Sequence, residues 1–335
     1  PVAMALNDKS GAPAKTFLLE RGELGKRADE VQPGFPAVLL PGAKEAPAAV
    51  TGQPASTGRR LALADWVADA DNPLTARVIV NRLWQHHFGH GLVRTASDFG
   101  LRGQKPTHPE LLDWLATELV AGGWRLKRLH RLMLLSETYQ QSTRASKAAA
   151  TVDPDNKLLS HANRLRLEGE AVRDSLLAVS GRLNPTAGGP GVVLPETARA
   201  AGGSRAVAVT ADASQYTRRS VYLFQRRNLK LAFLEAFDLP DSNLSCPKRE
   251  HSTTATQALA LLNADETVTA ATALADRVRR GAKTDEERVT LAYRLALGRA
   301  PTAKEAERAK AFLTASPLSE LCRALFNVNE FIYLD

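Results

Sequence analysis

Cysteine is scarce in this sequence of 335 residues, which contains only Cys246 and Cys322. The two form neither a CxxC nor a CxxCH pattern, so the sequence has no zinc knuckle and no covalent haem-attachment motif. The sequence is compatible with a disulfide between them and with two free thiols. The glycine-rich loops of P-loop and dinucleotide-binding proteins are also absent, as is the G-x-S-x-G pattern of a nucleophile elbow.

Long apolar runs are missing as well, and no segment is long enough to cross a bilayer as a helix. No signal peptide is recognisable and the chain starts at a proline, so we expect a piece of a longer protein. Positive charge is plentiful, with a formal net charge of +8 and a pI near 9.6. Because this charge is spread along the chain, nucleic-acid binding rests on net charge alone and is not favoured.

Apolar residues recur at helical spacing through most of the chain after about residue 58. We therefore predict a mainly α fold: a multi-helix domain with an extended N-terminal arm and one short buried strand or small β element. Residues 1–58, rich in Pro, Gly and Ala, are expected to form the arm or linker. The helical domain is expected over 59–335, with a first half at 59–183, a mobile Gly/Ala/Pro-rich loop at 184–214 and a second half at 215–335.

Several helix starts are marked by capping residues. Asn72 suits an N-cap position and Pro73 the first helical position. Three Thr–Glu pairs fit the capping-box spacing: Thr107 with Glu110, Thr284 with Glu287, and Thr302 with Glu305. These patterns predict where helices begin.

The stretch from Tyr216 to Asn263 is expected to form the polar centre of the domain. Within it, residues 220–224 are apolar on both faces at period two, which predicts a buried strand. Arginines flank this segment on both sides: Arg218, Arg219, Arg226 and Arg227. Arginines at the ends of a buried strand need acceptors. They would bind either internal carboxylates (Glu235, Asp238, Asp241 or Asp98) or an anionic ligand such as a glycan.

A second basic cluster, Lys248 and Arg249, precedes a helix that contains Gln257. Helix N-termini bind anions, so this cluster is a candidate ligand site; the alternative is a plain N-cap. Asn81 and Gln257 are further candidates, or interior polar groups that tie helices together. By contrast, carboxylates and arginines at helical spacing in residues 164–174, Arg173 among them, are expected to form a solvated ion-pair face.

Catalytic candidates are few. Asp98 and His108 could form an acid/base pair across one loop, and the carboxylates of Glu235 and Asp238 are a second choice; each also has a structural interpretation as a cap or ion-pair partner. His86, His87 and His90 form H-H-x-x-H, but Gly89 interrupts the helix that would align them and a third ligand is missing. We therefore predict no metal site.

A set of short motifs resembles a known family. In order, they are NPLTAR at 72–77, NRLW at 81–84, SDFG at 97–100, HPELLDWL at 108–115, RRSVY at 218–222, FDLPD at 237–241, QALALLN at 257–263 and NEF at 329–331. Together they resemble DUF1553, also called PSD1, a domain of unknown function abundant in planctomycetes and related bacteria. The resemblance covers almost the whole chain from about Thr16.

The resemblance implies a setting rather than a reaction. Proteins of this family typically carry an export signal, with a cytochrome c domain and a DUF1549 domain upstream. It therefore implies an exported protein, periplasmic or extracellular, whose partners are those two domains, and a haem only in the part upstream of this chain. No cofactor is expected in the chain itself, and no catalytic residue can be carried over from the family.

The function predicted from the sequence is a non-catalytic binding or scaffold module. It would bind an anionic glycan or a partner domain through its arginine-rich centre. A hydrolase acting on extracellular or envelope polysaccharide is the second hypothesis, and a nucleic-acid-binding module is the third.

Overall fold

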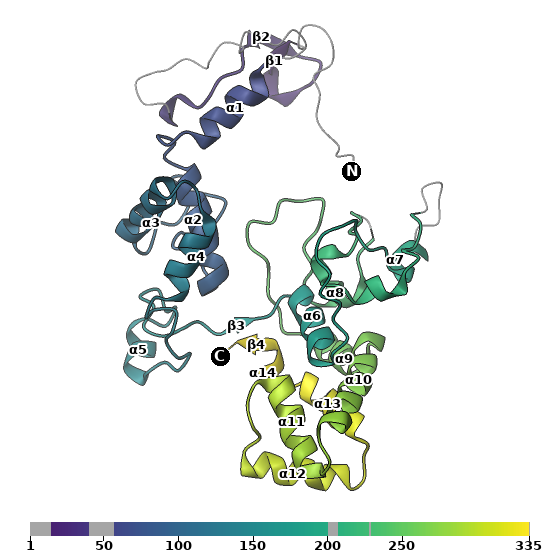
Figure 1. Ribbon diagram of the computed structural model, residues 1–335. Helices are drawn as coiled ribbons and strands as arrows, with labels where there is room; N and C mark the ends of the chain where they lie inside the picture. The colour runs from purple at the N-terminus through teal and green to yellow at the C-terminus, as the bar shows by residue number, and fades with distance from the viewer. Residues whose placement is uncertain (1–14, 40–56, 200–206, 228, 335) are drawn as a thin grey trace. The chain divides into compact units, whose positions relative to one another are not determined.

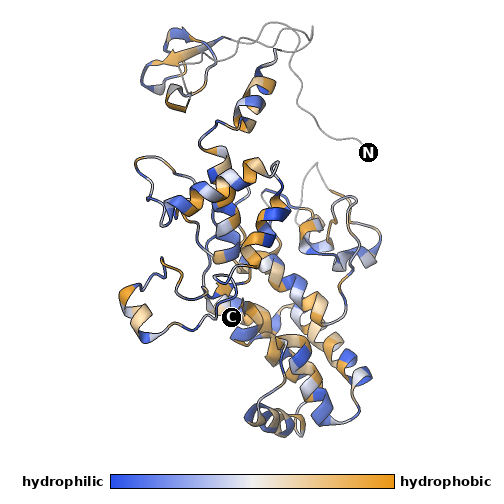
Figure 2. Cartoon of the chain, turned by 60° about the vertical axis from the view of Figure 1, so that its left-hand side comes forward, coloured by the Kyte–Doolittle hydropathy of each residue, from blue (hydrophilic) through white to orange (hydrophobic). Residues whose placement is uncertain are grey.

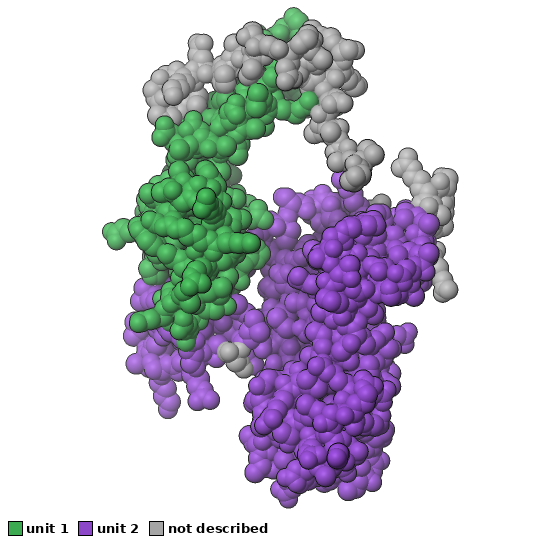
Figure 3. Space-filling view, viewed as in Figure 1, with its two compact units in different colours: residues 1–140 green, residues 141–335 purple. Residues whose placement is uncertain are grey.

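The computed structural model describes residues 15–39, 57–199, 207–227 and 229–334. The chain forms two compact units, Pro1–Gln140 and Gln141–Asp335 (Figure 3). The described residues contain fourteen α-helices and two small two-stranded sheets (Figure 1). This confirms the mainly α, multi-helix fold with small β elements. The sequence-based boundaries near residues 58, 183 and 214 stay predictions.

The first unit combines a hairpin with a small helical core. Strands β1 (Thr16–Leu19) and β2 (Arg27–Val31) pair antiparallel within the N-terminal arm. The helices are α1 (Arg59–Ala68), α2 (Thr75–Phe88), α3 (Pro109–Ala121) and α4 (Leu126–Leu134). Helices α2, α3 and α4 pack on one another and bury their apolar residues, among them Val80, Trp84, Leu115, Leu129 and Met133.

The second unit contains the remaining helices. They are α5 (Lys147–Val152), α6 (Gly169–Val179), α7 (Pro195–Arg199), α8 (Ala232–Ala236), α9 (Ala255–Asn263), α10 (Asp265–Gly281), α11 (Asp285–Leu297), α12 (Ala303–Leu313), α13 (Leu318–Phe326) and α14 (Asn329–Ile332). Strand β3 (Leu165–Arg166) pairs antiparallel with β4 (Tyr333–Leu334), joining the start of the unit to its end.

Helix α10 is the centre of the second unit's core, because α6, α9, α11 and α13 all pack against it. Its residues Leu274, Ala275 and Val278 are completely buried, as is Phe326 of α13. Burial of a Leu, Val or Phe side chain is worth roughly 1.5–3 kcal/mol. Apolar and polar residues alternate along the helices (Figure 2), so each helix can bury one side and hydrate the other.

The strand predicted at residues 220–224 is wrong. Ser220–Tyr222 forms a short 3₁₀ turn, and Val221 is 70% exposed. The cause is a tertiary contact: Asp174 of α6 accepts hydrogen bonds from both the backbone N–H (2.7 Å) and the hydroxyl (2.8 Å) of Ser220. Only one isolated parallel bridge, between Leu223 and Val192, remains of the extended conformation.

Two of the four predicted helix starts are confirmed. The start predicted at Asn72 and Pro73 is wrong, because α2 begins at Thr75 with Leu74 as its N-cap, although the Asn72 side chain accepts from the N–H groups of Leu74 and Thr75. Both bonds of the capping box are present at Thr284 with Glu287 and at Thr302 with Glu305. The third box is wrong: the N-cap of α3 is His108, and the N–H of Thr107 donates to the carbonyl of Leu92 instead.

Three further expectations have definite outcomes. Cys322 is completely buried, Cys246 is exposed, and both are free thiols, so the disulfide does not form. Among the described residues, no helix has the length and apolarity needed to cross a membrane. Within the segment predicted to be mobile, Val192 is buried and bonded to Tyr222 and Phe224; residues 200–206 lie outside the described residues.

We predict that Arg299→Gln weakens the second unit at neutral pH more than at acid pH. Arg299 bonds Glu330 (2.6 Å) and Glu305 (2.8 Å) at once. The hydrogen bonds that Glu305 accepts from Arg299 and from the N–H of Thr302 lower the pKa of Glu305 from 4.5 to about 2. Because the pKa of Glu305 is lower in the folded state, the Arg299–Glu305 pair stabilises the fold above about pH 4.5. This stabilisation is lost as the pH falls towards 2.

Urea unfolding monitored by circular dichroism at several pH values measures the effect. We expect the free energy of unfolding of Arg299→Gln to be roughly 0.5–1 kcal/mol below that of wild type at pH 7, since partly exposed ion pairs are weak. This difference in unfolding free energy should become smaller below pH 4.5. Arg308→Gln, an exposed arginine of α12, is the control. A difference that stays constant down to pH 2 would contradict the assignment.

Candidate functional site

Helix α6 organises the polar residues of the second unit. It presents Glu170, Arg173 and Asp174 at positions i, i+3 and i+4, and Glu168 is its N-cap residue. The helix starts at Gly169, where a Cβ atom would lie 2.8 Å from the Cβ of Phe237. A glycine here lets the helix approach α8 closely, which brings the loop after α8 next to these side chains.

Arg249 binds Glu170 through two parallel hydrogen bonds. The pairs Nη1–Oε2 and Nη2–Oε1 are 2.6 Å and 3.0 Å apart, and Nη1 also lies 3.2 Å from the carboxylate of Glu168. Burial raises the pKa of Glu170, but the bond and charge of Arg249 outweigh it and hold the pKa below its usual value. Glu170 is therefore ionised at neutral pH.

Arg219 is paired with a different carboxylate of α6, that of Asp174. Its Nε is 3.5 Å from Oδ2 of Asp174, and 64% of its side chain is exposed. The other oxygen of Asp174 is bonded to Ser220. The Arg219 guanidinium is thus held by one long ion pair and is otherwise accessible.

These groups line a cavity of about 570 Å³, which we call the α6 cavity. Its walls come from α6, the 219–223 turn and the loop that follows α8, and its charged lining residues are Glu168, Glu170, Asp174, Asp241, Arg219 and Arg249. Carboxylates outnumber guanidinium groups. Volumes of about 300–1,000 Å³ are typical of small-molecule sites.

Arg218 and Arg173 have internal structural roles. Arg218 is 3% exposed, donates to the carbonyls of Thr186 and Gly188, and lies over the ring of Tyr222 at 4.0 Å. The solvated face expected for Arg173 is wrong, because its guanidinium is buried and donates to the carbonyls of Tyr216 (2.6 Å) and Arg218 (3.1 Å). The predicted carboxylate partners of Arg218 and Arg219 are also wrong, because carbonyls and Asp174 take that place.

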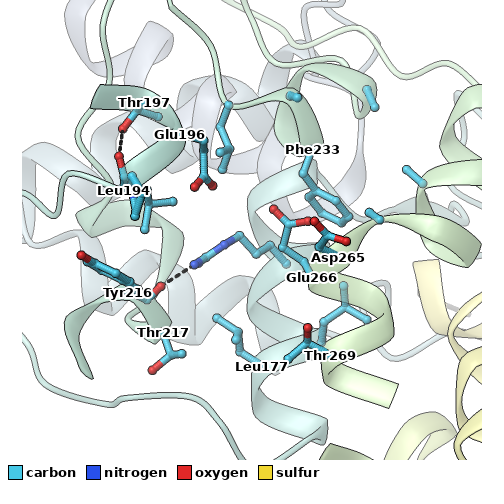
Figure 4. A pocket seen from close by; sticks show the side chains of 18 of the residues that line it. Leu177, Leu194, Glu196, Thr197, Tyr216, Thr217, Phe233, Asp265, Glu266 and Thr269 are labelled. Atoms are coloured by element: carbon cyan, nitrogen blue, oxygen red, sulfur yellow. Dashed lines mark hydrogen bonds between the residues drawn. The ribbon is translucent and has the colours of Figure 1, made fainter. Parts of the chain in front are cut away.

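A larger cavity, of about 820 Å³, lies on the Arg173 side of α6. Figure 4 shows its apolar lining by Leu177, Leu194 and Phe233, with the carboxylates of Glu196 and Glu266 inside it. Burial lowers the pKa of Arg173, while Asp174, Glu266 and Glu196 oppose that change. The sequence contained no signal for this cavity, because its walls come from segments far apart in the chain.

Asp238 is the centre of a hydrogen-bond network next to α9. It accepts from the N–H (2.8 Å) and hydroxyl (2.7 Å) of Ser252 and from the amide of Gln257 (3.1 Å). Its φ of 60° is in the left-handed region, which Asp and Asn tolerate better than most residues. Burial raises its pKa, but the bonds from Ser252 and Gln257 lower it more, so Asp238 is an ionised acceptor and not a proton donor.

Gln257 connects this hydrogen-bond network to Tyr333 in β4. Its carbonyl oxygen accepts from Arg166 (2.6 Å), and Arg166 donates to the hydroxyl of Tyr333 (2.8 Å). The Tyr333 hydroxyl also bonds Thr253 (3.0 Å). Gln257 is 1% exposed, which supports its interpretation as an interior tie between helices.

The remaining candidates of the second unit are Glu235, Arg226 and Lys248. Glu235 is exposed on α8. Arg226 forms an isolated bridge with Leu229, and the carbonyl of Lys248 accepts from the Cys246 thiol. The structure therefore brings Arg219 and Arg249 to one cavity and joins Asp238 to Gln257 by a hydrogen bond.

Three candidates lie in the first unit and are structural. Asn81 is completely buried and bonds both the N–H (2.8 Å) and the carbonyl (3.0 Å) of Val93. Asp98 accepts from the N–H of Gly100, and His108 bonds the hydroxyl of Thr107. Asn81 thus ties α2 to the loop that follows it, and Asp98 and His108 each bond a close neighbour in sequence.

The three histidines of H-H-x-x-H do not share a helical face. Helix α2 ends at Phe88, and Gly89 takes a left-handed φ of 81°, so His90 lies beyond the helix. Among the described residues, no three His, Cys, Asp or Glu side chains are grouped as metal ligands.

Comparison with models of known protein families gives a match. Residues 59–313 match the model of PSD1, a protein of unknown function (DUF1553). The chain belongs to the PSD1 family. The match covers α1 to α12 and thus both cavities, whereas the β1–β2 hairpin and β4 of the polar network lie outside it. No curated protein and no solved structure matches the chain.

We predict a graded loss of stability in Asp238 variants. Asp238→Asn keeps tolerance of the left-handed backbone but weakens the bonds to Ser252, and should cost about 1 kcal/mol. Asp238→Ala leaves the Ser252 N–H without an acceptor, leaves the Gln257 amide with only the Ser252 hydroxyl, and strains the backbone. It should cost roughly 2–4 kcal/mol. Urea unfolding at pH 7 is the measurement.

Asp276→Asn, which removes an exposed carboxylate of α10, serves as the control. If Asp238→Asn and Asp238→Ala were both as stable as wild type, the network would contribute nothing and the backbone would not be strained.

Proposed function

We propose that the domain is a non-catalytic binding module whose α6 cavity binds a polyhydroxylated ligand, a segment of a glycan. The observation that carries the proposal is that Arg219 and Arg249 reach one cavity from different loops, among the carboxylates of Glu168, Glu170 and Asp174. Guanidinium and carboxylate groups together supply planar donors and acceptors that suit vicinal hydroxyl groups.

The charges of the α6 cavity favour a neutral or amino-bearing glycan over an acidic one. Four carboxylates and two guanidinium groups line it, and Arg249 is already paired with Glu170. An anionic ligand would meet net negative charge, which disfavours its approach. This changes the expectation, based on arginines alone, of an anionic ligand.

The ionisation of the carboxylates supports binding rather than hydrolysis. Glycosidases need one carboxyl group that stays protonated near neutral pH. The pKa values of Glu170 and Asp238 are instead lowered by their hydrogen-bond donors. Neither residue is suited to donate a proton to a leaving group.

A glycan-binding screen of the purified chain against Arg219→Ala tests the proposal. We expect a neutral or amino-bearing oligosaccharide to bind, and Arg219→Ala to bind roughly ten- to hundredfold more weakly, because a charge-assisted hydrogen bond is worth about 1.5–3 kcal/mol. Titration calorimetry with the best oligosaccharide gives the dissociation constants. Because Arg219 is exposed, the variant should fold normally.

Arg308→Ala, which removes an exposed arginine of α12, is the matched control and should bind like wild type. The proposal fails if no oligosaccharide binds or if both variants bind equally well. Salt-sensitive retention of duplex DNA in its place would favour the nucleic-acid hypothesis.

We further propose that the domain acts within an exported protein, alongside cytochrome c and DUF1549 domains that also serve as its partners. This rests on the family resemblance alone. Cell fractionation with an antibody to this chain, followed by haem staining, should show a haem-positive band in the periplasmic or extracellular fraction. A haem-negative band confined to the cytosol would contradict it.

A further inference from the structure

A histidine pair ties two helices of the first unit together. His87 lies in the last turn of α2 and His130 lies in α4, and Nε2 of His87 is 2.8 Å from Nδ1 of His130. Both side chains are half-buried. At this distance one ring must donate its N–H to the bare nitrogen of the other.

Tyr139 rests on this pair. Its ring meets His87 edge-on at 5.8 Å and Phe88 edge-on at 5.7 Å, and Phe88 stacks on the buried Trp84 at 4.0 Å. Edge-to-face contacts of this kind are favourable. Tyr139 is followed by Gln140, the last residue of the first unit. Its ring therefore anchors the segment 136–140 to α2.

The pair can accept one proton but not two. In the neutral pair, and in the pair with one added proton, one N–H still points at one lone pair. A second added proton leaves two N–H groups facing each other with no acceptor, so the hydrogen bond is lost and two positive charges adjoin. Burial lowers the pKa of His87, and His130 and then His86 lower it further.

The surrounding charges do not compensate a second proton. Helix α2 contributes Arg82 and His86, and α4 contributes Lys127, Arg128 and Arg131, all positive or neutral. The acidic residues Asp113 and Glu118 of α3 are paired with Arg77 and Arg128. Glu110 at the start of α3 and Glu137 in the segment after α4 are exposed, where screening weakens their effect.

We propose that His87, His130 and Tyr139 form an acid-sensitive latch, which holds the segment 136–140 against α2 at neutral pH and releases it on acidification. Release frees the last residues of the first unit, from which the chain continues into the second.

Hydrogen exchange of the full chain at several pH values tests the latch, with rates corrected for intrinsic exchange. We expect protection of residues 136–140 to fall roughly tenfold or more between about pH 7.5 and pH 5, as the hydrogen bond and ring contacts are lost. Protection of α13, buried in the second unit, should stay constant over the same range.

His130→Gln removes the titrating partner and should make the protection of residues 136–140 independent of pH, whatever its absolute level. His86→Gln, a change at the exposed neighbouring histidine, should keep the transition of the wild type. The latch is overturned if wild-type protection does not change with pH, or if the transition persists in His130→Gln.

Ring-nitrogen NMR of the wild type gives a second measurement that needs no variant. We expect the pKa of His87 to lie below the usual histidine value of ~6.5, because burial and the neighbouring His130 lower it. Titration of His87 at that usual value would rule the latch out.

Discussion

The second unit depends on the hydrogen bonds that the buried guanidinium group of Arg173 donates. It donates to the carbonyls of Tyr216 and Arg218 and to the hydroxyl of Ser220. Removal of a buried charged donor would leave these carbonyls without a partner, at a cost of about 1–3 kcal/mol each. Through these bonds, one side chain of α6 fixes the turn that carries Arg218 and Arg219.

This arrangement also separates the two cavities of the unit. Arg173 lies on the side of the larger cavity, while Glu170 and Asp174 of the same helix line the α6 cavity. Ser220 connects the two sides, since its hydroxyl contacts both Arg173 and Asp174. Because the turn is held from both sides, Arg219 reaches the α6 cavity from a fixed backbone.

Polar networks join distant parts of the chain in both units. In the second unit, Asp238, Gln257 and Arg166 lead to Tyr333 at the end of the chain, next to the β3–β4 pair. In the first unit, Asn81 holds the loop at Val93 by two backbone bonds. Buried polar groups that are fully paired in this way specify a single arrangement of the helices and loops around them.

The sequence by itself determined the helical class, the family and the helix starts at Thr284 and Thr302, because these depend on residues a few positions apart. Only the tertiary structure decided the roles of the arginines and the conformation of residues 220–222. Arg173 and Arg218 bind carbonyls 30 to 45 positions away, and Ser220 is turned by Asp174, which no local pattern encodes. Local propensity favoured a strand there, and hydrogen bonds from a distant helix outweighed it.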